Sequence, residues 1–332
     1  MMEQRFFTAI HKSEEVLKKS SSGGMFTAIT DMWLNEYGEK AAIYGCVMDE
    51  HLNARHIRAT DTVGRDRMRG SKYISSDVSG VFKMVASDLI NGLYVVFSGT
   101  PCQISGLLSY LSAIGIKKNK QLLTVEVICH GVGSNRFFSD YISYFEKKYK
   151  SKAVSCNFRA KSRPGKIQDM EITFENGKKY NASSTKYDWF YSAYTGYILR
   201  PACFNCKFAK KERYADISIA DNWNKSDSAD SKNHSSVVIT NSEEGYECFI
   251  KSSVCFDFVE KEFEEIHQPN LRAPTSMPQK YNDFWKAYSQ GGYLDAQKFL
   301  GNNTFKGKIR SLVVDILYKF RLIERVKRIV GR

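Results

Sequence analysis

The sequence predicts an α/β (α+β) fold: strands and helices alternate over the N-terminal part, and a more strand-rich second half is followed by C-terminal helices. Two observations carry this prediction. Short apolar runs alternate with segments of helical periodicity over the first 150 residues, whereas the stretch from about 151 to 270 offers strand-like runs with few long helices between them. The 332 residues favour about two domains and are ample for a sizeable core.

We expect the alternation in the first 150 residues to form a layered structure around a buried sheet. The segment 25–37 has its apolar residues at helical spacing, and a loop of serines and glycines precedes it. Helices are also expected at 78–91 and 103–114, and strands within 1–20 and at 41–48, 51–60, 93–97 and 122–128.

The second half of the chain is expected to add strands at 154–159, 168–174 and 217–219, and helices at 278–300 and 306–330. The polar stretch 224–234 indicates a mobile loop. The sequence therefore divides into an α/β region at 1–150, a strand-rich region at 151–270 and a basic helical tail at 271–332.

Composition and the length of the apolar runs exclude several classes of protein. Hydrophobic residues make up 42% and charged residues 26%, as in a soluble globular protein. No run of 18 apolar residues is present, so no spanning helix is expected, and the polar first 24 residues lack the apolar core of a signal peptide. We therefore expect a cytoplasmic protein with reduced thiols.

The net charge of +13 is concentrated at the C-terminus. Residues 306–332 contain nine cations and two carboxylates, so a uniformly basic nucleic-acid-binding body is not indicated. Such a helix either docks on the anionic inner face of a membrane or packs on the protein body with a solvated basic outer face. Six apolar residues of this tail fall on one helical stripe: Ile309, Leu312, Val313, Ile316, Phe320 and Ile323.

The eight cysteines, in a chain without an export signal, favour metal or cluster ligation over disulfides. The one close pair, Cys203-x-x-Cys206, places two thiolates within reach of a single centre. Zinc and iron–sulfur ligation both stay open on the residues alone, and a redox dithiol is disfavoured because the preceding Arg-Pro-Ala does not indicate a thioredoxin-like setting. Four other cysteines are expected to be small core residues: Cys46, Cys156, Cys248 and Cys255.

Two loops combine small residues with groups that suit a phosphate or a flavin. Ser22-Gly23-Gly24 precedes the helix at 25–37, where free N–H groups and the helix dipole attract an anion, and Thr27 lies in the first turn. Ser71-Lys72-Tyr73 offers a hydroxyl, a cation and an aromatic ring. The alternatives are an ordinary helix start for the first loop and a surface turn for the second.

Further residues with special chemistry come directly after strands, where ligands bind in α/β sheets. Ser98 and Thr100 lie in the turn after the strand at 93–97, and Cys102 follows. The strand at 122–128 ends at Cys129-His130-Gly131.

Seven segments match one family in order and spacing. The most specific are Ser-Gly-Thr-Pro-Cys-Gln-Ile at 98–104 and Ile-Cys-His-Gly-Val at 128–132. The others are Ser-Ser-Gly-Gly-Met-Phe-Thr-Ala at 21–28, Arg-Gly-Ser-Lys-Tyr at 69–73, Phe-Arg-Ala-Lys at 158–161, Arg-Pro-Ala-Cys-Phe-Asn-Cys at 200–206 and the run at 213–223. With these segments the chain resembles the coenzyme F420 hydrogenase/dehydrogenase beta-subunit family, in its bacterial branch, from about residue 20 to 245.

The resemblance implies an iron–sulfur flavoprotein oxidoreductase that passes electrons from a one-electron donor through one [4Fe–4S] cluster to FAD and on to a substrate. Because no cysteine precedes Cys46, the ferredoxin-like module of many relatives is not expected, and the donor is expected to be a separate carrier such as ferredoxin or a reduced deazaflavin. Because bacterial relatives often belong to surface-polysaccharide gene clusters, the resemblance implies a small, sugar-linked substrate. The implied cluster ligands are Cys102, Cys129, Cys203 and Cys206, and the implied FAD contacts are Ser22, Gly23, Gly24, Thr27, Ser71, Lys72, Tyr73, Ser98 and Thr100.

Four further residues are candidates for catalysis or substrate binding. His130 either donates a proton to a substrate at the flavin or makes a hydrogen bond that tunes the cluster. Asp221 either flanks the active site or takes part in structural packing. Arg159 and Lys161 alternate on a strand and share a face, which either binds an anionic substrate or redox partner or is a solvated basic surface.

The chain departs from the family pattern at two places. No cysteine precedes Cys46, so the ferredoxin-like module of many relatives is not expected here. Relatives show Gly-Asp-Phe-Trp-Gly where this chain has Ala-Asp-Asn-Trp-Asn at 220–224, which changes the backbone freedom there. A competing interpretation is a non-enzymatic module, in which the four cysteines hold structural zinc and the basic tail docks on a membrane surface or a partner.

Overall fold

The computed structural model describes residues 3–161, 169–181, 189–224 and 235–300, together with Ile309 and Val313. These residues belong to two compact units. The first unit contains Met1–Val132 and Pro201–Thr275, and the second contains Gly133–Arg200 and the described residues from Ser276 onward. The units do not coincide with the consecutive regions 1–150, 151–270 and 271–332, because the chain leaves the first unit after Val132 and returns to it at Pro201.

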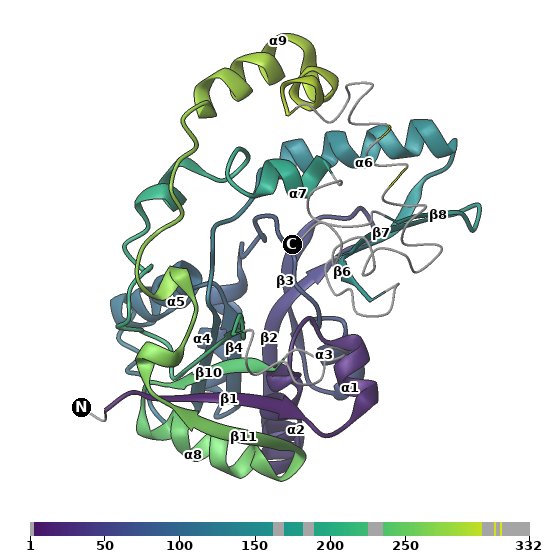
Figure 1. The fold of residues 1–332 in the computed structure, drawn as a ribbon. Coiled ribbons are helices and arrows are strands. Elements are labelled where there is room, and N and C mark those ends of the chain that lie inside the picture. The colour runs from purple at the N-terminus through teal and green to yellow at the C-terminus, as the bar shows by residue number, and fades with distance from the viewer. Residues whose placement is uncertain are drawn as a thin grey trace. The chain divides into compact units, whose positions relative to one another are not determined.

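The first unit is built on an eight-stranded mixed sheet with the order β11-β1-β10-β9-β5-β4-β2-β3 (Figure 1). The four neighbours β9, β5, β4 and β2 are parallel, whereas β3, β10 and β11 run antiparallel to the strands they pair with. The carboxyl ends of β4 and β5 therefore meet at one edge of the sheet. The strands are β1 (Arg5–His11), β2 (Ala41–Met48), β3 (Ala54–Ala59), β4 (Tyr94–Gly99), β5 (Leu122–Val127), β9 (Ile217–Asp221), β10 (Ser236–Thr240) and β11 (Phe256–Lys261).

Helices cover both faces of this sheet. Helices α2 and α8 pack on one face, and α4 and α5 pack on the other. Side chains that alternate along β2 feed both cores, since Ile43 packs on the side of α2 and Tyr44 on the side of α4 and α5. This is the layered arrangement that the alternation of strands and helices predicts. The four helices are α2 (Met25–Tyr37), α8 (Glu243–Ser252), α4 (Val81–Ile90) and α5 (Pro101–Ala113).

Shorter elements complete the first unit. Two short α-helices and five 3₁₀ turns connect the larger elements among its described residues. They are α1 (Glu14–Lys19), α3 (Thr62–Asp66), η1 (Gly38–Lys40), η2 (Pro201–Asn205), η3 (Ser253–Cys255), η4 (Phe263–Glu265) and η5 (Pro269–Leu271).

The second unit combines a small antiparallel sheet with helices that pack through aromatic side chains. Its sheet has the order β6-β7-β8. Phe137 of α6 contacts the rings of Phe284 and Tyr288 on α9, and the Tyr288 hydroxyl donates a hydrogen bond to Asp140 at 2.6 Å. The elements are β6 (Ala153–Ala160), β7 (Asp169–Phe174), β8 (Lys179–Asn181), α6 (Asn135–Tyr149), α7 (Trp189–Tyr194) and α9 (Tyr281–Phe299).

The α/β fold class is confirmed, and the helix expected at 25–37 and the strand expected at 41–48 have those bounds in the structure. The elements α6, α8, β10 and β11 were not expected from the sequence. Both β10 and β11 pair with β1, at the opposite end of the chain from them.

Two expectations fall largely on residues outside those described. Of the loop at 224–234 only Asn224 is described, and of the tail at 306–332 only Ile309 and Val313, both helical and nearly half exposed, at 45% and 46%. Among the described residues, no helix combines the length and the apolarity that crossing a membrane requires.

Candidate functional site

The four cysteines implied as cluster ligands all belong to the first unit. Cys102 is the second residue of α5, directly after β4, and Cys129 follows β5 by two residues. Cys203 lies in the turn η2, and Cys206 follows that turn. Two of the ligand positions are therefore fixed by neighbouring parallel strands, and the other two by the segment that leads into β9.

The thiols of Cys102, Cys203 and Cys206 all lie within electrostatic reach of the Cys129 thiol. The pKa of the Cys129 thiol is raised to about 12, mainly by burial and also by the nearby thiols of Cys102, Cys203 and Cys206, while a hydrogen bond from the Gly131 N–H acts in the opposite direction. Gly131 adopts φ 140°, a conformation that L side chains rarely take, so a glycine after His130 lets the chain turn back toward the Cys129 sulfur.

No single-ion site is formed in the part of the chain that the structure describes, where no group of three or more His, Cys, Asp or Glu side chains is placed to hold a metal ion. Around one zinc ion, thiolate sulfurs lie about 2.3 Å from the metal and are therefore tightly packed. A four-iron cluster separates its thiolates further. The Cys102, Cys203 and Cys206 thiols are thus near Cys129, but the described side chains do not form a group placed to hold a single ion.

A chain of hydrogen bonds runs from Cys102 into the interior. Cys102 Sγ lies 3.2 Å from Thr100 Oγ1, which lies 3.1 Å from Gln103 Oε1. Gln103 Nε2 donates to Ser76 Oγ at 2.8 Å, and Ser76 Oγ lies 3.0 Å from His56 Nδ1. Sequence analysis missed Gln103, Ser76 and His56, because their contacts join segments far apart in the chain.

The tautomer of His56 follows from its partners. Its Nε2 lies 2.9 Å from the carbonyl oxygen of Ser98, which only accepts, so Nε2 carries the proton and Nδ1 accepts from the Ser76 hydroxyl. Burial lowers the pKa of His56 and keeps the ring neutral. Ser98, expected to contact the cofactor, is 8% exposed and uses its carbonyl to hold this ring.

His130 is fixed by a residue far along the chain. The hydroxyl of Thr275 donates to the His130 carbonyl oxygen at 2.6 Å and lies 3.0 Å from His130 Nδ1. The imidazole is therefore held in one orientation directly after the candidate ligand Cys129. Both roles expected for His130, proton donor and hydrogen-bond donor that tunes the cluster, are open to a ring held in this way.

The loop before α2 is packed tightly against the sheet. A Cβ added to Gly23 would lie 2.5 Å from the Ala9 carbonyl oxygen and 2.6 Å from the Ser236 nitrogen, so only glycine fits. Ser22 Oγ donates to the Ser235 carbonyl at 2.9 Å. Gly24 then takes a left-handed conformation at φ 84°, and it caps α2 without a side-chain hydrogen bond.

The two loops expected to bind the cofactor meet in the structure. The Ser71 N–H donates to Ser21 Oγ at 2.8 Å. In the first turn of α2, Thr27 is 1% exposed, and its hydroxyl has no hydrogen-bond partner among the described residues. The Nε atom of Arg69 is also buried and has no hydrogen-bond partner among the described residues. The Nη2 atom of Arg69 forms an ion pair with Asp66 at 2.6 Å. Unpaired buried donors beside a helix start are suited to an anion.

Lys72 does not extend toward solvent. Its Nζ donates to the carbonyl oxygens of Met68 and Arg69 at 2.8 and 2.9 Å, and it lies near the Cys46 thiol. Burial lowers the pKa of Lys72 to about 8. Lys72 therefore closes the loop that carries Ser71 and Tyr73, and Tyr73 is half-buried.

Asp221 ends β9, and its carbonyl oxygen accepts a hydrogen bond from Gln268. Asn222, which stands where relatives have phenylalanine, is buried and donates from Nδ2 to Ser235 Oγ at 2.9 Å. Trp223 is 53% exposed. The asparagine thus fixes the turn after β9 through side-chain hydrogen bonds.

Arg159 and Lys161 belong to the second unit. Arg159 lies on β6 and is 5% exposed, and Lys161 follows the strand and is half-buried. Arg159 is therefore not part of a solvated basic surface, which was the alternative expected for this pair. Of the cysteines expected in the core, Cys248 is buried and the other three are half-buried.

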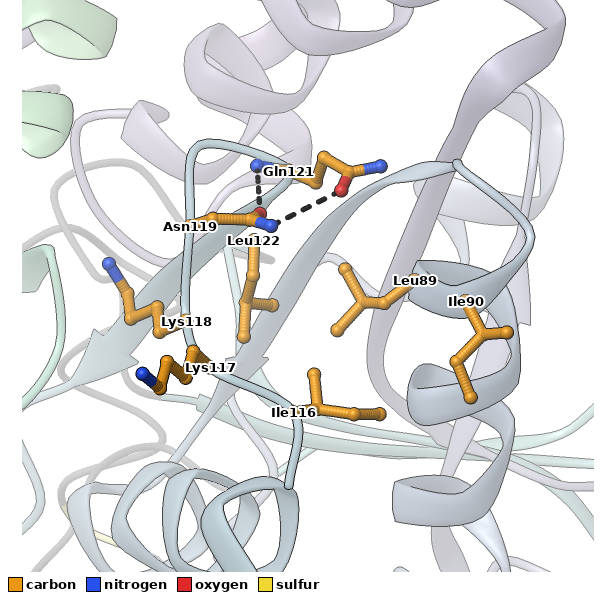
Figure 2. A pocket seen from close by; sticks show the side chains of 8 residues that line it. All are labelled: Leu89, Ile90, Ile116, Lys117, Lys118, Asn119, Gln121 and Leu122. Atoms are coloured by element: carbon orange, nitrogen blue, oxygen red, sulfur yellow. Dashed lines mark hydrogen bonds between the residues drawn. The ribbon is translucent and has the colours of Figure 1, made fainter. Parts of the chain in front are cut away.

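A small pocket lies at the end of β5 opposite to the candidate ligand Cys129. Figure 2 shows it at the start of β5, lined by Leu122, by Leu89 at the end of α4 and by Ile116 and Lys117. Its volume is about 80 Å³. Cys129 follows the opposite end of β5, so this pocket takes no part in the cysteine site.

Comparisons with known proteins agree with this geometry. A family model for the C-terminal part of the beta subunit in coenzyme F420 hydrogenase/dehydrogenase matches residues 93–262, just over half of the chain and the part that carries all four candidate ligands. Among curated proteins no relative matches.

Among solved structures, a chain of the F420-reducing [NiFe] hydrogenase complex from Methanosarcina barkeri, derivatised with xenon, is similar in fold with a TM-score of 0.53 and 18% identity. The similarity covers 89% of this chain and 90% of that one. The chain therefore belongs to the coenzyme F420 hydrogenase/dehydrogenase beta-subunit family, a family of redox proteins.

Proposed function

We propose that the chain is an iron–sulfur flavoprotein oxidoreductase in which Cys102, Cys129, Cys203 and Cys206 hold one [4Fe–4S] cluster. The observation that supports this most directly is the gathering of these four thiols from three separate segments into one electrostatically coupled group. Thiolates are the ligands that iron–sulfur clusters and zinc prefer. The family to which the chain belongs favours the iron–sulfur cluster over zinc.

We propose that FAD binds beside the start of α2. The support is local: the helix start lacks a side-chain cap, the hydroxyl of Thr27 is buried without a partner among the described residues, and Arg69 lies in the neighbouring loop. A phosphate there would accept from the Thr27 hydroxyl and from main-chain N–H groups. Arg69 is the residue of this site that sequence analysis did not assign.

Bound FAD exchanges electron pairs with a substrate and single electrons with a cluster, which neither the side chains nor the main chain can do. The chain's own residues hold these groups and move protons. Thr100 holds the Cys102 thiol at 3.2 Å, and Thr275 fixes the ring of His130. His130 is the residue that we propose to hold and deliver a proton to the substrate, and Asp221 ends β9 at the same edge of the sheet.

The proposed electron donor is a separate carrier, either an acidic one-electron protein such as ferredoxin or a reduced deazaflavin. Lys207 and Lys211 are exposed just after Cys206, and this charge favours an acidic protein. We propose that the substrate is a small, sugar-linked molecule in surface polysaccharide synthesis. We propose that the protein acts in the cytoplasm. Both rest on the resemblance to the bacterial branch alone.

The test is the cofactor content of anaerobically purified protein. We expect a brown protein with about four irons, about four sulfides and one FAD per chain. Zinc without flavin would replace the proposal with a structural zinc module, and flavin without iron, with oxygen excluded, would remove the role of the four cysteines.

A further inference from the structure

Arg213 and Glu126 form an ion pair inside the first unit, and both side chains are 1% exposed. Arg213 Nε donates to Glu126 Oε1, and Ser218 Oγ donates to the same oxygen at 2.7 Å. Glu126 on β5 and Ser218 on β9 are paired in the parallel ladder. The carboxylate is therefore held by both strands as well as by the guanidinium.

The other end of the guanidinium holds the loop that follows Cys206. Arg213 Nη1 donates to the carbonyl oxygens of Phe208 and Lys210, at 2.6 and 3.0 Å. The Ala209 N–H donates to the Cys206 carbonyl at 3.2 Å, so the loop is closed from its first residue. The Arg213 side chain thus binds two carbonyls of this loop and also the Glu126 carboxylate on β5.

Cys129 lies only three residues beyond Glu126. The ladder between β5 and β9 continues past Glu126, since the Ile128 N–H donates to the Ile219 carbonyl at 2.9 Å. Cys129 and Cys206 are therefore connected through β5, the buried ion pair and the closed loop. Two buried atoms of the pair, Glu126 Oε2 and Arg213 Nη2, have no hydrogen-bond partner among the described residues. Neither residue of the ion pair is among the candidate ligands.

We propose that the Arg213–Glu126 ion pair is a positioning device that sets the Cys203–Cys206 segment against Cys129 in the protein without its cluster. That this placement serves cluster binding rests on the proposed function. The placement itself can be measured in the protein without a cluster. A guanidinium suits this task because its planar fork donates to a carboxylate and to carbonyls at once, which a lysine ammonium cannot reproduce in the same directions.

The same sheet contains a matched control. Lys118 Nζ binds Asp216 Oδ1 at 2.7 Å, and Asp216 Oδ2 accepts from the Thr124 N–H at 2.8 Å. The Asp216 side chain is 3% exposed, and Thr124 lies on β5 two residues before Glu126. Lys118→Met therefore removes the cation, itself 29% exposed, of a second ion pair whose carboxylate contacts β5, toward the end of the strand away from the cysteines.

The experiment measures alkylation of individual cysteines in the cluster-free, reduced protein by iodoacetamide and mass spectrometry. Cys248 on α8 is an internal reference, because it is buried in the same unit and is not a candidate ligand. The ratio of the Cys129 rate to the Cys248 rate separates local loosening from opening of the whole unit, which would speed both.

We expect Arg213→Met to raise the ratio of the Cys129 and Cys248 rates roughly tenfold, Arg213→Lys to raise it less, and Lys118→Met to leave it within about twofold of the wild type. Equal ratios in Arg213→Met and the wild type, both folded by circular dichroism, would overturn the proposal. So would equal rises in Arg213→Met and Lys118→Met, because the pair would then act on general stability only.

A second measurement follows release of iron from the reconstituted protein to an anaerobic chelator, which we expect to be roughly tenfold faster in Arg213→Met than in Lys118→Met. Equal release rates in the two variants count against the positioning role. If the wild-type protein takes up no iron, the proposed function fails, and the alkylation ratios still decide the positioning role.

Discussion

Gln103 accepts two hydrogen bonds from Thr100, one from its N–H at 2.9 Å and one from its hydroxyl at 3.1 Å. The hydroxyl also lies 3.2 Å from Cys102 Sγ, and the Gln103 amide nitrogen reaches Ser76. One glutamine side chain therefore connects the first turn of α5, which carries a candidate ligand, to the polar group around His56.

Replacing Gln103 tests that connection. We expect Gln103→Leu to lower the free energy of unfolding by about 1–2 kcal/mol, because the Thr100 N–H and Ser76 lose their partner. We also expect a changed alkylation rate of Cys102 in the cluster-free protein. Gln121→Leu is the control, since the Gln121 amide donates to the Leu93 carbonyl at 3.5 Å and accepts from Asn119 Nδ2 at 3.3 Å, away from the cysteines. Equal Cys102 rates in the two variants would contradict the connection.

His56 makes stability depend on pH in the acid range. Its pKa is lowered by burial in the folded state, so the unfolded chain binds more protons as the pH falls below 6.5. We expect the wild type to lose stability through this range more steeply than His56→Phe, whose ring keeps the stack on Phe97 without titrating. Urea unfolding of both proteins between pH 7.5 and 5, at steps of about 0.5 unit, measures the difference. Parallel curves would contradict the neutral, buried imidazole.

Lys72 makes stability depend on pH in the alkaline range. Its pKa is about 8 when folded and 10.5 when unfolded, so the unfolded chain holds more protons between these values. Stability therefore rises with pH across this window, by at most about 3 kcal/mol. We expect Lys72→Met to lack this rise. Both proteins should carry Cys46→Ala, because the neighbouring thiol, whose pKa burial raises, titrates in the same range with the opposite sign. A rise that persists in Lys72→Met would contradict the assignment.

Replacing Thr27 distinguishes a structural role from a ligand-binding role, because the two roles predict different effects on stability and on FAD affinity. Its buried hydroxyl has no partner among the described residues, so Thr27→Val should leave the flavin-free protein as stable or up to about 1 kcal/mol more stable. The same change should weaken FAD binding about tenfold if the hydroxyl binds a phosphate. Thr30→Val is the control: Thr30 accepts from Arg65 at 2.6 Å, so its loss should destabilise the protein. Unchanged FAD affinity in Thr27→Val would remove Thr27 from the site.

The sequence predicted the elements whose signal is local. The helix Met25–Tyr37 and the strand Ala41–Met48 were found because apolar spacing and flanking small residues mark them within one window. Strands β10 and β11 were not found, because each is short and its identity depends on pairing with β1, more than 200 residues earlier in the chain.

The same distinction holds for the site. The four cysteines were assigned by resemblance, and the structure gathers them. The residues that hold them were beyond the reach of sequence analysis, because Glu126 and Arg213 stand 87 positions apart and Gln103 and Ser76 stand 27 apart. Only the folded sheet brings such pairs together.

The central claim is that these four cysteines, and not the other four, hold a four-iron cluster. The most direct test is iron and sulfide content, with the electron paramagnetic resonance spectrum after reduction, for anaerobically reconstituted single variants. We predict about four irons per chain in the wild type and in Cys248→Ser, and a lost or converted cluster in Cys102→Ser, Cys129→Ser, Cys203→Ser and Cys206→Ser. Full iron content and an unchanged spectrum in any two of these four variants would contradict the claim.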